Sequence, residues 1–115
     1  MKYMCLVIVD EALADAMQPN DWAIMDKQSQ AYDQSLIDSG VYLHAEALQG
    51  AKTARTVRLR DGKAMITDGP FAESKEVIGG FILVEAADQD AAMEIAKKIP
   101  MARLGAIEVR PVMSF

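Results

Sequence analysis

The hydrophobic pattern of the first third of the chain predicts a strand followed by a long helix. Residues 2–9 are almost continuously apolar and rich in β-branched side chains, which favours a central strand covered on both faces. After Pro19, apolar side chains recur at helical spacing as far as Leu36, and Gly40 stands where a left-handed C-terminal cap is expected. We therefore expect a helix from Pro19 to Ser39.

Residues 41–48 predict a second strand, whose alternation divides the side chains between two faces. One face is apolar, whereas the other carries Tyr42, His44, Glu46 and Leu48. Because His44 and Glu46 are two residues apart, we expect them on the same side of the strand, about 7 Å apart along the backbone. This second face therefore holds the groups best suited to chemistry.

A hairpin is the clearest local signal in the middle of the chain. Residues 54–60 and 63–67 flank Asp61-Gly62, a two-residue turn that tolerates positive φ at both positions and so matches the twist of paired strands.

The last third predicts another strand, helix and strand. Residues 81–86 form an apolar run, Asp88 or Asp90 can cap a helix that ends before Pro100, and residues 106–112 form the final strand. The order β-α-β, hairpin, β-α-β favours an α+β fold with the helices on one face of a sheet.

Composition narrows the class of protein. The 115 residues fit one domain, residues 1–115, and 51% hydrophobic with 25% charged residues is ordinary for a globular chain. A net charge of −5 argues against nucleic acid as a partner, because phosphate binding needs a clustered basic surface. No apolar run approaches the roughly 18 residues that span a bilayer, so we expect a cytoplasmic protein with no membrane partner.

Neither a metal nor a cofactor is expected. One histidine and one cysteine cannot build a typical zinc site, and Cys5 on a strand is best interpreted as a small buried hydrophobe. Gly79-Gly80 lacks the spacing of a dinucleotide-binding loop and precedes a strand instead of a helix, so it predicts a bulge or a close backbone approach.

Residues 67–80 combine a tight turn, four charged side chains and a double glycine between apolar strands. Asp68-Gly69-Pro70-Phe71 and Gly79-Gly80 resemble the signature of the DGPF-domain proteins, a branch of the YCII-related superfamily. Further segments that resemble the family lie at residues 1–4, 40–41, 46–49, 60–63, 99–100 and 108–111, so the resemblance covers nearly the whole chain.

The resemblance implies a ferredoxin-like fold of the dimeric α/β barrel type, with an antiparallel βαββαβ sheet and two helices on one face. The hairpin at residues 54–67 would then be an insertion before the third strand. In such a layer the helices cover one sheet face only, yet Tyr3, Cys5 and Val7 alternate with the equally apolar Met4, Leu6 and Ile8. We expect the bare face to be buried in a homodimer.

Founding YCII-like proteins are associated with a His-Asp pair: a histidine in the first helix and an aspartate before a proline after the second helix. The matching positions here are Ser29, counted back from Gly40, and Ile99, which precedes Pro100. A mechanism that relies on this pair is therefore not expected, since neither side chain exchanges protons near neutral pH.

Two acidic residues and a histidine remain as candidate catalytic groups. They are Asp68, which can act as a general base or simply accept backbone N–H bonds in its turn, and the pair Glu46 and His44, which is equally compatible with ordinary surface hydrogen bonds. The candidate ligand-binding residues are Tyr42, Arg58, Thr67 and Phe71.

Several functions are compatible with these residues. We favour a homodimer that binds a small organic molecule, without assigning it a reaction. The first alternative is an isomerase or lyase that uses carboxylate acid-base chemistry, with Glu46 or Asp68 as the base and His44 or Arg58 stabilising negative charge. The second, which rests on the resemblance, is a regulatory module linked to an alternative sigma factor.

Overall fold

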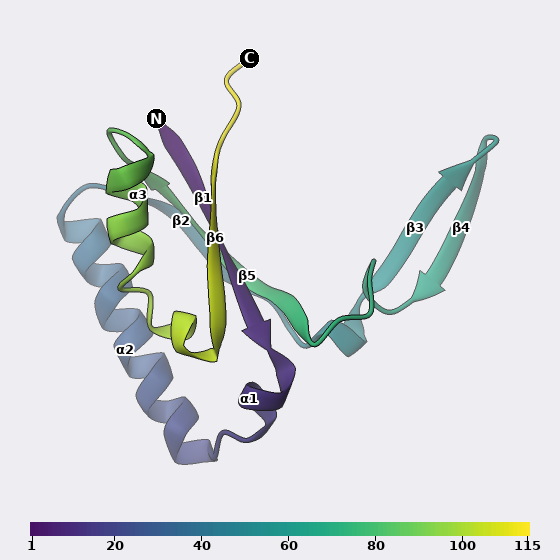
Figure 1. Cartoon of the computed structure of the whole chain (residues 1–115), viewed down its shortest axis with the longest axis horizontal. Coiled ribbons are helices and arrows are strands. Elements are labelled where there is room, and N and C mark those ends of the chain that lie inside the picture. The colour runs from purple at the N-terminus through teal and green to yellow at the C-terminus, as the bar shows by residue number, and fades with distance from the viewer.

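A four-stranded antiparallel sheet in the order β2-β5-β1-β6 forms the centre of the protein (Figure 1). The computed structural model describes residues 1–115. The four strands are β1 Lys2–Asp10, β2 Tyr42–Ala47, β5 Glu76–Glu85 and β6 Gly105–Pro111. Helices α2 (Pro19–Asp38) and α3 (Gln89–Ala96) cover one face, which confirms the predicted ferredoxin-like α+β fold.

The hydrophobic core lies between this sheet and the two helices. Alternate residues of β1 are buried under the helices, and Cys5 and Val84 are completely inaccessible to solvent. Burial raises the pKa of the Cys5 thiol to about 11, so this residue is the inert hydrophobe that the sequence predicted. The other core residues are Tyr3, Val7, Val9, Met25, Leu36, Ile82, Ala92, Ala96, Ile99 and Leu104.

Helix α2 begins and ends where the sequence pattern predicted. Gln18 and Asp21 form a capping box at its start, and Gly40 follows its end with a φ of +79°. The sequence pattern did not predict the short helix α1 (Glu11–Asp15), which begins because the Asp10 carboxylate accepts hydrogen bonds from the Ala12 and Leu13 N–H groups.

Helix α3 is shorter than the pattern suggested. It ends at Ala96, and Ile99 is buried from the turn that follows rather than from the helix itself. A 3₁₀ segment, η2 (Pro100–Leu104), then leads into β6. A second 3₁₀ segment, η1 (Ala51–Thr53), follows β2 and leads to the hairpin.

The hairpin forms a separate two-stranded sheet of β3 (Arg55–Arg60) and β4 (Lys63–Asp68), which projects from the body (Figure 1). Its turn residues Asp61 and Gly62 have φ values of +51° and +75°, as a type I′ turn requires. The predicted hairpin is therefore confirmed at its predicted turn.

Strand β5 begins at Glu76, earlier than the apolar run predicted, because Gly79 and Gly80 are accommodated inside the strand. The register of β1 against β5 shifts between Val7 and Ile8, which leaves Gly79 without a partner. A Cβ atom on Gly80 would lie 2.6 Å from the Glu46 carbonyl oxygen. The double glycine thus serves both the bulge and the close approach expected of it.

We predict that Gly80→Ala lowers the free energy of unfolding by roughly 1–3 kcal/mol, because the added methyl group meets the backbone of β2. Gly50→Ala is the matched control, since a Cβ atom there has no neighbour within 4 Å. Urea denaturation of both variants measures the difference. Equal losses of stability in the two variants would show that the close approach of β5 to β2 does not make Gly80 necessary for stability.

Candidate functional site

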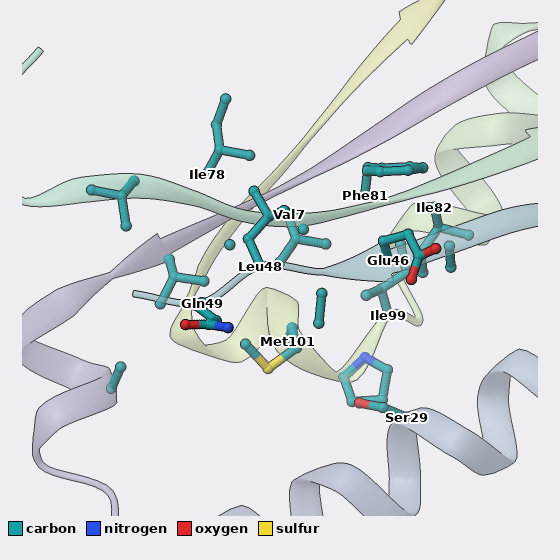
Figure 2. Close-up of a pocket in the computed structure, with 18 of the residues that line it drawn as sticks. Val7, Ser29, Glu46, Leu48, Gln49, Ile78, Phe81, Ile82, Ile99 and Met101 are labelled. Atoms are coloured by element: carbon teal, nitrogen blue, oxygen red, sulfur yellow. The ribbon is translucent and has the colours of Figure 1, made fainter. Parts of the chain in front are cut away.

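A cavity of about 560 Å³ lies between the sheet, α2 and η2 (Figure 2). This volume falls within the range of sites that bind small organic molecules. Its apolar lining comes from the sheet and from the segment after α3, and includes Val7, Val9, Ala45, Ile82, Ile99 and Met101. Helix α1 and the segments 47–51 and 77–80 complete the lining.

Helix α2 contributes a stripe of four residues to the cavity: Trp22, Asp26, Ser29 and Asp33. The spacings of four, three and four residues place all of them on one face of the helix. No side-chain hydrogen bond or ion pair within the chain involves Asp26, Ser29 or Asp33. Polar groups that face an apolar sheet without a protein partner are available to a ligand.

Asp33 is the partly buried carboxyl group of this stripe. Partial burial raises its pKa above the ordinary value of 3.8, since the charged form loses hydration and gains no partner. Pairing a carboxylate with a cation has the opposite effect on its pKa. The electrostatics of Asp33 are therefore those of a group that lacks a counter-ion.

Glu46 and His44 lie next to each other, as their spacing predicted. The Glu46 carboxylate is 2.9 Å from His44 Nε2, and the His44 ring centroid is 5.9 Å from that of Phe81. Glu46 also contributes to the lining of the cavity at the edge strand β2, whereas His44 does not. Because Glu46 pairs with Phe81 and His44 with Leu83, both side chains belong to the sheet face that no helix covers. Both side chains are more than half exposed in the single chain, so a catalytic role for the pair stays a prediction.

Tyr42 does not share a face with His44, contrary to the simple alternation. The register of β2 against β5 shifts between these two residues, so Tyr42 pairs with the buried Val84 while His44 pairs with Leu83. Tyr42 packs against the core and lines the cavity. A single irregular residue therefore moves Tyr42 to the helix-covered side of the sheet.

The remaining predicted residues lie on the hairpin and its corner, and none of them lines the cavity. Asp68 is almost fully exposed, and its carboxylate is 3.3 Å from Arg55 Nε across the hairpin instead of accepting bonds from the turn. The Arg58 guanidinium lies 5.0 Å from the centre of the exposed Phe71 ring. Thr67 is likewise an exposed residue of β4. A single chain therefore does not bring Asp68 and Glu46 together.

The Asp-Gly-Pro corner is held by the backbone of the hairpin. Gly69 has a φ of +100°, its N–H donates to the Ala54 carbonyl, and its own carbonyl accepts a bond of 2.8 Å from the Thr56 hydroxyl. The corner is thus the rigid turn that the residue types indicate.

Sequence reasoning missed Trp22, Asp26 and Asp33. The available signal was the helical spacing of two carboxylates on the apolar side of a predicted helix. Both positions at which the family resemblance expects the His-Asp pair, Ser29 and Ile99, do line this cavity (Figure 2). No group of three or more metal-ligating side chains is present, and no helix is long and apolar enough to cross a membrane.

The fold and the cavity define a ferredoxin-like protein with a small-molecule-sized space between its long helix and its sheet. A model of the YCII-related domain matches residues 1–115, so the chain belongs to the YCII-related family. The chain is also 30% identical over 114 residues to an uncharacterised protein of Rhizobium meliloti (strain 1021), an alignment that covers 97% of this chain and 92% of that relative.

We predict that Asp33→Asn stabilises the protein at neutral pH, because it removes a charge that burial disfavours. The folded state holds the proton of the Asp33 carboxyl group more tightly than the unfolded state does. The loss of folding stability caused by the charged form is therefore absent below pH 3.8, and it grows as the pH rises towards the higher pKa of the folded state. Chemical denaturation across this pH range measures the effect. Glu73→Gln, in an exposed turn, is the control for loss of one negative charge.

The stability advantage of Asp33→Asn should therefore be largest at neutral pH and should shrink on acidification. An advantage that is independent of pH, or one that Glu73→Gln reproduces, would contradict a burial penalty at Asp33.

Proposed function

We propose that this protein is a homodimer that binds a small organic molecule in the cavity between α2 and the sheet. One observation carries the proposal: the inward face of α2 presents Asp26, Ser29 and Asp33, without protein partners, to an apolar space of about 560 Å³. A helix that only closed a core would place apolar side chains at these positions. The polar groups therefore fit a role in orienting a ligand over the apolar lining.

Two uncovered apolar surfaces support the dimer. Met4, Leu6 and Ile8 of β1 alternate with the residues buried under the helices, so they lie on the face that no helix covers. This open face also receives Phe81 and Leu83 of β5, which pair with Leu6 and Met4. Large exposed apolar surfaces are rare on monomers, and a two-fold pairing of sheets would bury this one.

The hairpin supports the same assembly independently. Its strand pairing places Val57, Leu59 and Ile66 on one face, and these side chains are 61%, 70% and 59% exposed. A two-stranded ribbon without a core is only marginally stable in water. A second copy of the chain would supply the missing apolar contacts.

Carboxylate acid-base chemistry is the second candidate function. It is favoured by the contact between Glu46 and His44, which orients a carboxylate and an imidazole beside the cavity. Ser29 and Ile99 supply no acid-base pair at the positions expected from the family resemblance. Glu46 and His44 of β2 are therefore the groups that would transfer a proton.

We predict that Ser29→Phe abolishes ligand binding by filling the centre of the cavity. The test is a thermal-shift screen with neutral, acidic and basic metabolites, since a ligand of the native state raises the melting temperature by mass action. Gln30→Phe is the matched control, because Gln30 is exposed and does not line the cavity. Hits that survive Ser29→Phe would place the binding site elsewhere.

We predict a two-chain mass in analytical ultracentrifugation at micromolar concentration, and a one-chain mass for Leu6→Lys. The substitution places like charges near each other across the paired open faces, which disfavours association. Leu13→Lys, at an exposed site on α1 that does not line the cavity, should leave the dimer intact. A one-chain mass for the unaltered protein would refute the dimer.

A further inference from the structure

All the ionisable residues with a carboxylate or a basic group that line the cavity are acidic. Glu11 and Asp15 come from α1, Asp26 and Asp33 from α2, and Glu46 from β2. No lysine, arginine or histidine lines the cavity, although the chain holds 12 lysine and arginine residues. The cavity therefore combines an apolar lining with a strongly negative potential.

Four of the twelve basic residues lie together in another part of the molecule. Arg55, Arg58, Arg60 and Lys63 lie on the projecting hairpin, outside the cavity lining. Among the five lining carboxylates, only Glu46 has an ionisable partner in the chain, namely His44. The negative charge of Asp26 and Asp33 is thus left for something other than this chain to balance.

We propose that the ligand of this cavity is an organic cation: an amine with an apolar body. This inference rests on the proposed function and names the chemical class of the molecule bound. The ammonium group would lie against the inward stripe of α2, where Asp26 and Asp33 accept its hydrogen bonds. The apolar body would cover Val7, Ile82 and Ile99.

Trp22 strengthens the preference for a cation. It occupies the same inward stripe one helical turn before Asp26, and it is half-buried against the core. The indole face attracts ammonium groups, and a neighbouring carboxylate adds to that attraction. An anionic ligand, by contrast, would lie against the carboxylates of α2 with no cation to receive it.

A metal ion does not satisfy the same arrangement. The carboxylates come from three elements, and no three metal-ligating side chains of the protein converge on one point. Divalent ions require several oxygen ligands at about 2.0–2.6 Å. Much of the cavity is apolar, which suits a carbon skeleton and gives nothing to a hydrated ion.

Three probes with one apolar body and different head groups test the inference: 3-phenylpropylamine, 3-phenylpropan-1-ol and 3-phenylpropanoate. Isothermal titration should give the amine an affinity at least about tenfold above that of the alcohol, because its charge interacts with the carboxylates of the lining, Asp33 being partly buried. The phenylpropanoate should bind more weakly than the alcohol. Added salt should weaken binding of the amine more than binding of the alcohol.

Variants of the α2 carboxylates test whether they cause the preference for the amine. Asp26→Asn and Asp33→Asn should each reduce amine affinity by about fivefold or more while leaving alcohol affinity unchanged. Asp38→Asn is the control, since Asp38 lies on the same helix, is exposed and does not line the cavity. Circular dichroism verifies that each variant is folded.

The outcomes separate this inference from the proposed function. If the alcohol or the acid binds as tightly as the amine, and Ser29→Phe removes that binding, the cavity is a ligand site and the inference of a cationic ligand is wrong. Amine binding that is unchanged in the Asp26→Asn, Asp33→Asn double variant also overturns the inference. If none of the three probes binds, both the inference and the proposed function are contradicted.

Discussion

The one-sided covering of the sheet is the constraint on which the rest of this structure depends. The side chains of β1 are apolar on both faces, yet α2 and α3 cover only one of them. Tyr3, Cys5, Val7 and Val9 anchor the helices by burial, which is the main favourable contribution to folding. Met4, Leu6 and Ile8 are left on the other side, where only a second molecule could cover them to the same degree.

The cavity arises from incomplete packing within the same layer. Met25 and Leu36 of α2 are buried in the core, but the stripe that contains Asp26 and Asp33 holds polar side chains over an apolar sheet. The partly buried Asp33 carboxylate reduces stability here, because it loses hydration without gaining a partner. A site that sacrifices stability in this way is typical of function, since binding a complementary group recovers the lost interaction.

The hairpin and the cavity differ in the sign of their charges. Four of the twelve basic residues lie on β3 and β4, whereas the charged residues of the cavity are all acidic. The DGPF corner is part of the hairpin, because the Gly69 N–H donates a hydrogen bond to the Ala54 carbonyl and the Asp68 carboxylate contacts Arg55. The corner lies at the base of the hairpin, directly after β4.

Local signals in the sequence determined the elements that depend on local chemistry. The Asp61-Gly62 turn and the cap at Gly40 formed as predicted, and Asp88 is the one of two predicted candidates that caps α3. Each depends on a residue's own backbone or hydrogen-bonding preference. The double glycine was also interpreted correctly, since only glycine tolerates the close approach of two backbones. The order of these elements was sufficient to predict an α+β sheet with helices on one face, and the family resemblance implied its ferredoxin-like plan.

Tertiary structure alone decided which residues share a site. The irregular register at the start of β2 turned Tyr42 to the covered face, and the hairpin holds Asp68 outside the cavity that Glu46 helps to line. The inward position of Asp26 and Asp33 depended on the rotation of α2 against the sheet, which Met25 and Leu36 fix by long-range packing. Sequence determines which side chains are present and the local shape around them, whereas a site requires groups distant in the chain to meet, and only the packed core sets those distances.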